Sequence, residues 1–149
     1  MRPHPAGFLL LLGLAALPAP AQTSTRISSE VPVLNFRLPA YTPSGGFRAW
    51  LVRGSEARVL GPNDIDIKEL TLTIFTGDAR DRIETLILSP VATVAPEDQR
   101  ASGAEAIRVI NDNFEASGTD WHYDYREKKV SIARNVRVVL HSELKDLLK

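Results

Sequence analysis

The chain has 149 residues, with 18 basic and 18 acidic side chains, so its formal net charge is zero. This balance excludes the long-range electrostatic attraction that draws basic proteins to nucleic acid or to anionic membranes. The length is enough for one domain with its own hydrophobic core. Because the chain contains no cysteine, we expect neither disulfides nor a lipoprotein anchor.

Residues 1–21 have the pattern of a secretory signal peptide. A basic start precedes an apolar run at 8–17, and residues 19–21 (APA) form an A-x-A cleavage site. The apolar run is shorter than the roughly 20 residues that a transmembrane helix needs. We expect cleavage before Gln22 and, since small exported eukaryotic domains usually carry disulfides, a bacterial periplasm. The alternative is an uncleaved signal that anchors the chain in the inner membrane.

Residues 22–46 contain Pro32, Pro39 and Pro43. These prolines exclude a continuous helix or a central strand. The sequence predicts a Pro-rich extended segment, with an edge strand around 33–38.

From 47 to 140, short apolar stretches alternate with polar turns, which is typical of successive antiparallel hairpins. The pattern predicts strands at 47–59, 65–75, 83–94, 105–110 and 114–118, followed by a terminal hairpin that turns at 126–129. Polar connections are predicted at 61–64, 76–82 and 95–104. Residues 141–149 have leucines at helical spacing and predict a short C-terminal helix or tail. No stretch between the strands is long enough for a crossover helix, so the fold class is all-β, an antiparallel open roll of successive hairpins.

Three positions predict irregularities within strands. Gly54 indicates a bulge or bend, the apolar phase changes parity at Lys68-Glu69, and Pro90 marks a break or an edge position.

Arg134 is a fourth irregularity, because it lies in phase with apolar residues on both sides. A charged side chain on a buried face is costly unless it is paired. Either the strand breaks at Arg134-Asn135, or the guanidinium lies at the mouth of a groove. Asn135 is a turn former and favours the break.

The terminal hairpin places aromatic residues on one face and polar residues on the other. The aromatic set is Trp121, Tyr123 and Tyr125, and the polar set is Asp120, His122 and Asp124. The polar set is read as a solvated face, with a metal site as the alternative. No nucleophile elbow, dinucleotide-binding loop or Walker loop occurs, so we expect no enzymatic activity, no cofactor and no metal.

Four segments show the succession of strands and short turns that is typical of a known family: AWLVRGSEAR; LILSPVATV followed by ASGAEAIRV; FEASGTDWHYDY; and KKVSIARNVRVVL. Across residues 47–140 the chain resembles the periplasmic lipopolysaccharide-export proteins of the LptC/LptA (OstA-like) family. The resemblance implies a β-jellyroll whose sheets splay open around an apolar groove. It also implies that the groove accepts the acyl chains of lipopolysaccharide (lipid A), and that successive jellyrolls of export proteins pair edge to edge.

The candidates for the sheet interior, and hence for such a groove, are the large apolar residues of the predicted strands. They are Trp50, Val52, Leu72, Ile74, Leu86, Leu88, Ile107, Val109, Phe114, Trp121, Tyr123, Val130, Ile132, Val136 and Val138. The sequence leaves open whether they form a closed core or line a groove. A closed core favours the alternative function, an adaptor domain that binds proteins without carrying lipid, whereas an open seam favours transport.

Overall fold

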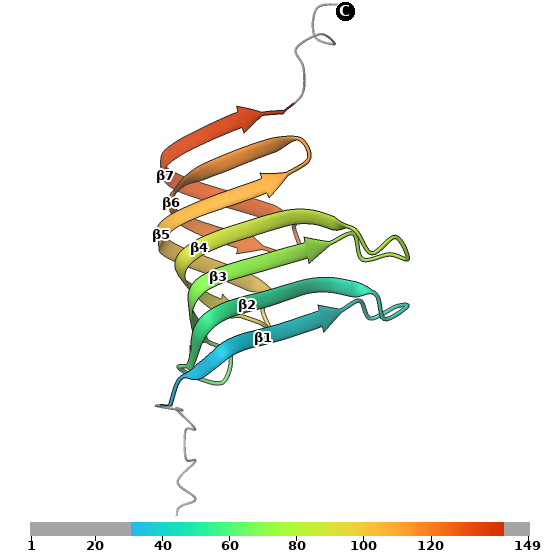
Figure 1. Cartoon of the computed structure of the whole chain (residues 1–149), viewed down its shortest axis with the longest axis vertical. Helices are drawn as coiled ribbons and strands as arrows, with labels where there is room; N and C mark the ends of the chain where they lie inside the picture. The colour runs from blue at the N-terminus through green and yellow to red at the C-terminus, as the bar shows by residue number, and fades with distance from the viewer. Residues whose placement is uncertain (1–30, 142–149) are drawn as a thin grey trace, which may run out of the picture.

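The computed structural model describes residues 31–141, which form one open sheet of seven antiparallel strands in chain order (Figure 1). The strands are β1 (Val33–Tyr41), β2 (Arg48–Val59), β3 (Ile65–Phe75), β4 (Ile83–Ala95), β5 (Arg100–Asn111), β6 (Phe114–Asp124) and β7 (Lys129–Leu140). The all-β roll of successive hairpins is therefore confirmed. Among residues 31–141 there is no helix of the length and apolarity needed to cross a membrane. The predicted signal peptide and C-terminal helix lie outside the described residues.

The predicted strands are present, with three changes in their bounds. The edge strand expected at 33–38 is β1, which continues through Pro39 to Tyr41. An edge strand pairs on one side only, so it tolerates the missing N–H of proline. The connection expected at 95–104 is shorter, because β5 begins at Arg100, and the segment expected at 114–118 continues as one strand to Asp124.

Every strand is interrupted near its middle, and the interruptions lie at the same level of the sheet. Pairing skips or shifts at these points: Asn35, 54–55, Glu69, Pro90, 104–105, Gly118, Asp120 and Asn135. Four of these residues, Asn35, Glu69, Asp120 and Asn135, have positive φ angles between 51° and 56°. Left-handed backbone and bulges bend a strand sharply, so the sheet folds over on itself (Figure 1). The irregularities predicted at Gly54, Lys68-Glu69, Pro90 and Arg134-Asn135 are present, as interrupted pairing within strands that continue through these positions.

The fold line divides the sheet into two arms. The short arm consists of residues 33–34, 56–59, 65–68, 91–95, 100–103, 121–124 and 129–132. The long arm consists of residues 36–41, 48–53, 70–75, 83–89, 106–111, 114–119 and 134–140. The hydrophobic core contains residues of both arms, so the sheet buries one of its own faces.

Two rows of residues in register supply eight of the 17 buried core residues within residues 31–141. The long-arm row is Leu38, Val52, Leu72, Ile87, Val109, Ala116 and Val138. The short-arm row is Val59, Ile65, Val94, Ala101, Tyr123 and Val130. Side chains that are in register across a sheet share a face, and the two rows face each other across the interior.

The phase predicted for β4 is wrong. Ile87 is fully buried in the long-arm row, whereas the predicted interior residues Leu86 and Leu88 pair with Thr73 and Thr71. Since successive strand residues point to opposite faces, both leucines lie on the outer face of the sheet. The apolar run around Ile87 has no alternation, so its phase is set by its neighbouring strands rather than by its own sequence.

Substitution of Gly118 tests whether β6 and β7 must approach each other closely at the fold line. A Cβ atom at this position would contact Cγ2 of Ile132 and would lie 2.6 Å from the carbonyl oxygen of Arg134. Gly118→Ala is therefore expected to destabilise the fold by about 1–3 kcal/mol, the usual cost of overpacking. Gly61→Ala is the matched control, since a Cβ there meets no atom within 4 Å. Urea unfolding of both variants measures the difference, and equal stabilities would contradict the steric account of the fold line.

Candidate functional site

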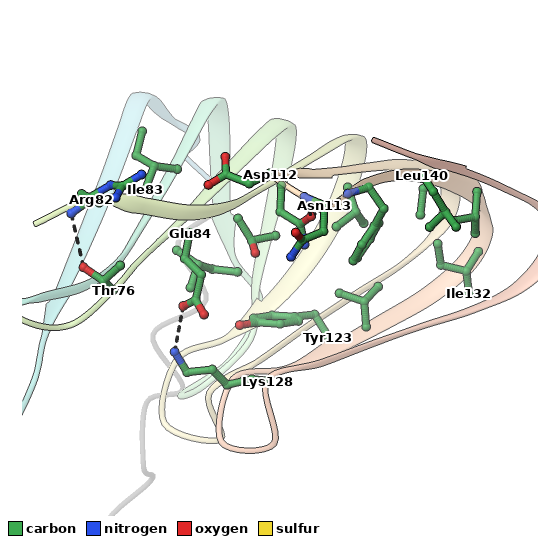
Figure 2. A pocket seen from close by; sticks show the side chains of 18 of the residues that line it. Thr76, Arg82, Ile83, Glu84, Asp112, Asn113, Tyr123, Lys128, Ile132 and Leu140 are labelled. Carbon is green, nitrogen blue, oxygen red and sulfur yellow. Dashed lines mark hydrogen bonds and ion pairs between the residues drawn. The ribbon is translucent and has the colours of Figure 1, made fainter. Parts of the chain in front are cut away.

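The interior opens into a groove of about 690 Å³ where β5, β6 and β7 approach the end of the sheet (Figure 2). Its apolar lining comes from both arms: Ile74, Val109, Phe114, Ala116, Val136, Val138 and Leu140 from the long arm, and Tyr123, Val130 and Ile132 from the short arm. The groove is thus a continuation of the core, not a separate surface depression.

The groove opens at this end because the side chains there are small and because the sheet ends. Along the long-arm row, Ile87 and Val109 are followed by Ala116 and then by Val138 of the edge strand. The small side chain of Ala116 therefore leaves space next to the edge strand. Beyond Val138 no further strand covers the interior within residues 31–141.

The long-arm half of β7 presents three exposed apolar residues to the groove. Val136, Val138 and Leu140 have exposed fractions of 53%, 55% and 68%, although they lie in phase with the buried face. On the short arm, Val130 and Ile132 of the same strand are only partly buried. Exposed apolar side chains that continue a core mark a surface suited to an apolar partner.

One flank of the groove is polar. Thr85 and Asn111 pair across β4 and β5 and both line the groove. From the opposite arm, the Tyr123 side chain extends along the groove with its hydroxyl toward Glu84 (Figure 2). Tyr123 is only 5% exposed. Burial raises the pKa of the Tyr123 phenol well above its usual range, and the neighbouring Tyr125, Glu84 and Asp124 add to the effect.

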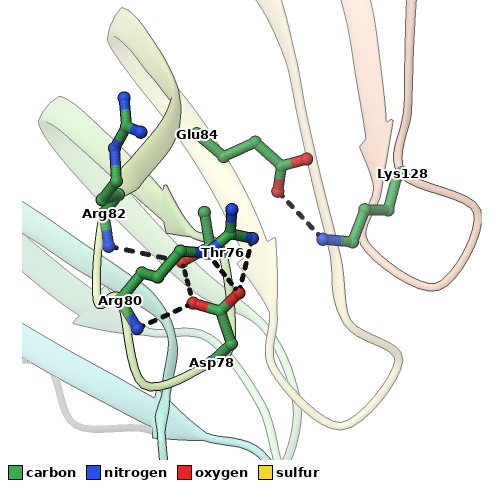
Figure 3. A network of polar contacts seen from close by, with 6 residues as sticks. All are labelled: Thr76, Asp78, Arg80, Arg82, Glu84 and Lys128. Carbon is green, nitrogen blue, oxygen red and sulfur yellow. Dashed lines mark hydrogen bonds and ion pairs between the residues drawn. The ribbon is translucent and has the colours of Figure 1, made fainter.

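An ion pair joins the two arms at the polar flank. Lys128 Nζ, in the turn of the β6–β7 hairpin, lies 3.0 Å from a carboxylate oxygen of Glu84 on β4 (Figure 3). Both side chains are about half exposed, with fractions of 48% and 46%. An ion pair so accessible to water contributes little to stability, typically 0–1 kcal/mol. The apolar core therefore holds the arms together, and this pair is free to open.

The loop between β3 and β4 forms the rest of the rim, and two contacts fix its shape. Arg48 of β2 binds Asp81 through two hydrogen bonds, at 2.8 and 2.6 Å. Within the loop, Asp78 accepts hydrogen bonds from the Arg80 guanidinium and the Thr76 hydroxyl (Figure 3). These bonds, the one from Arg80 first, lower the pKa of Asp78 to about 2, so this carboxylate stays charged at all physiological pH values.

The rim carries charges of both signs. Arg80, Arg82 and Lys128 line it together with Glu84 and Asp112. Arg80 and Lys128 are paired with carboxylates, whereas the Arg82 guanidinium has no ion-pair partner among residues 31–141. The net charge of the rim is therefore close to zero, and the rim does not select strongly for anions.

The fifteen predicted interior residues fall into three groups. The groove brings together Ile74, Val109, Phe114, Tyr123, Val130, Ile132, Val136 and Val138. The buried core away from the groove holds Trp50, Val52, Leu72, Ile107 and Trp121. The outer face holds Leu86 and Leu88. The core residues therefore shape the fold, and the residues toward β7 shape the groove.

The sequence reasoning missed the polar flank and the rim. Thr85 and Asn111 lie next to predicted turns and read as ordinary hairpin residues. Glu84 and Lys128 are 44 positions apart, and only the folding of the sheet brings them together. A usable signal was present for Leu140, which continues the apolar phase of Val136 and Val138.

The polar face of the terminal hairpin has ion-pair partners. Asp120 pairs with Arg134 and Asp124 with Arg100, and no cluster of metal-binding side chains occurs among residues 31–141. Arg134 thus lies outside the groove, on the strand break that its sequence context favours.

Comparison with known proteins does not identify a family for this chain. No protein-family model matches it, and no curated protein does.

Tyr123 gives the groove a spectroscopic signature. Its raised pKa means that the phenol stays protonated at about pH 11, above the usual tyrosine value near 10. Tyr123→Phe is thus expected to leave the ultraviolet tyrosinate titration of the folded protein unchanged up to that pH. Loss of one-third of the signal, one of three tyrosines, would contradict the raised pKa of Tyr123.

The same shift predicts how stability depends on pH. Above about pH 10 the unfolded chain releases a Tyr123 proton that the folded chain retains, so the unfolding free energy falls as pH rises. Urea unfolding from pH 8 to 11 is expected to show a shallower decline for Tyr123→Phe than for the wild type.

Proposed function

We propose that this chain is a non-catalytic component of periplasmic lipopolysaccharide export. It shields the acyl chains of lipopolysaccharide in the groove and pairs edge to edge with other β-rolls of the export machinery. The observation that carries the proposal is the open seam between the arms at β7, whose apolar lining is continuous with the core.

The size of the hydrophobic contribution supports an acyl ligand. Each methylene group removed from water contributes roughly 0.8 kcal/mol. An acyl segment of about ten methylenes, half covered by the groove, therefore gains several kcal/mol, enough for reversible binding and transfer. The seam also favours transport over the adaptor alternative, which a fully packed interior would suit better.

The free edges support assembly. Within residues 31–141, β1 and β7 each have a neighbouring strand on one side only. An unpaired edge can add a strand from a partner. Because the groove opens at β7, a partner strand added there would extend the apolar surface beyond Val138 and let an acyl chain pass between molecules.

Photo-crosslinking tests the carrier function with a matched pair on one strand. Val138 pairs with Ala116 on the groove face, and Val139 pairs with Glu115 on the outer face. Their exposed fractions are similar, 55% and 45%. A diazirine amino acid at position 138 of the full chain is expected to crosslink to lipopolysaccharide, and the same probe at 139 is not.

Mass spectrometry of the crosslinked chain, after its thermal unfolding has been checked against the wild type, reads out the result. Equal labelling at both positions would indicate non-specific adsorption. Labelling of 138 by protein partners alone would support the adaptor function and end the carrier proposal.

A further inference from the structure

Charge is unevenly distributed along this chain, although its formal net charge is zero. Residues 31–55, which include β1 and the first part of β2, contain Arg37, Arg48 and Arg53 but no acidic residue. The acidic side chains of the described sheet begin at Glu56. The β1–β2 hairpin is therefore the basic end of the sheet, at the opposite edge from the groove (Figure 1).

Two arginines of this hairpin face each other. Arg37 and Arg53 are in register and exposed, and they alternate with the inward residues Leu38 and Val52, so both lie on the outer face of the sheet. Neither arginine has an ion-pair partner among residues 31–141. Like charges directly opposite each other destabilise an antiparallel pair. An anion between the two guanidinium groups would relieve this repulsion and accept hydrogen bonds from both.

Exposed apolar side chains share this face with the arginines. The outward residues of β1 are Leu34, Arg37, Pro39 and Tyr41, all of them exposed. Leu34 and Tyr41 have exposed fractions of 68% and 58%. From Leu34 to Tyr41 the strand spans roughly 23 Å, at about 3.3 Å per residue. Basic and apolar side chains spread over such a length fit an extended surface better than a single small ligand.

We propose that the outer face of the β1–β2 hairpin docks on a lipid membrane that carries anionic headgroups. Arg37 and Arg53 bind headgroup phosphates, and Leu34 and Tyr41 enter the interface between headgroups and acyl chains, where tyrosine is favoured. The contact uses a face of the sheet and leaves the backbone edge of β1 free. Because this surface and the groove lie at opposite edges, the inference goes beyond the proposed function and does not rest on it.

The neutral net charge of the chain confines this attraction to short range. At physiological ionic strength the Debye length is about 8 Å, so charges farther than this from a bound headgroup are largely screened. Within β2 the one acidic residue, Glu56, is already bound to Arg58 at 2.9 Å and to Lys68 at 3.2 Å. Arg37 and Arg53 thus keep their positive charge available for a surface in direct contact.

Site-specific fluorescence quenching tests the proposal, because the chain contains no cysteine and a single introduced one can be labelled. A fluorophore on Pro39→Cys of the full chain reports on the proposed face. Nitroxide-labelled phospholipid is expected to quench it in vesicles of phosphatidylcholine with phosphatidylglycerol, and not in vesicles of phosphatidylcholine alone. Arg37→Gln and Arg53→Gln are each expected to lower the ratio of docked to undocked molecules about fivefold, the effect of one arginine near an anionic surface. Neither substitution should lower the melting temperature, since each removes a repulsion.

Arg137→Gln is the matched control. Arg137 is exposed and belongs to the same outer-face row as Arg37 and Arg53, but it lies on β7. Its loss should leave the quenching at position 39 unchanged, and a fluorophore on Val139→Cys should not be quenched.

Equal quenching in the two kinds of vesicle, equal quenching at positions 39 and 139, or unchanged quenching in Arg37→Gln and Arg53→Gln would overturn the proposal. Absence of quenching at position 39 would overturn it as well. If polyglutamate then changed the emission of that fluorophore, the face would belong to an acidic protein partner instead. None of these outcomes bears on the groove, whose test is the crosslinking at position 138.

Discussion

The structure depends on one constraint: a single sheet has to bury one of its own faces. With no second sheet and no helix among residues 31–141, apolar burial requires the strands to bend back at a common level. That level is set by backbone features, including glycine at Gly54 and Gly118 and left-handed residues such as Glu69 and Asn135. If one strand failed to bend, its neighbours would lose register on both arms, so the bends act cooperatively.

The groove follows from the same constraint. A sheet folded over on itself encloses its interior only where both arms have neighbours, and the last strand has none on one side. Large side chains such as Trp50 and Ile87 fill the middle of the interior, whereas Ala116 and Val138 leave room near β7. The fold thus produces an apolar opening next to an unpaired edge, the two features that the proposed transport function combines.

Much of this could be predicted from the sequence, and the remainder shows what sequence patterns lack. Gly54, Pro90 and Asn135 are residues with distinctive backbone preferences, so the bends were visible. The phase of β4 could not be predicted, because an uninterrupted apolar run has apolar residues on both faces of the strand. Ile87 points into the core because it is in register with Leu72 and Val109 of the neighbouring strands. The polar flank was hidden for another reason: Thr85 and Tyr123 meet only across the two arms.

The central claim is that an acyl chain occupies the space between the arms at β7. Nuclear Overhauser effects between an unlabelled dodecyl chain and the labelled methyl groups of the protein test it most directly. The account predicts contacts to Val130, Ile132 and Val138 and none to Leu88 or Val139 on the outer face. Contacts spread equally over both faces, or confined to the outer face, would contradict it.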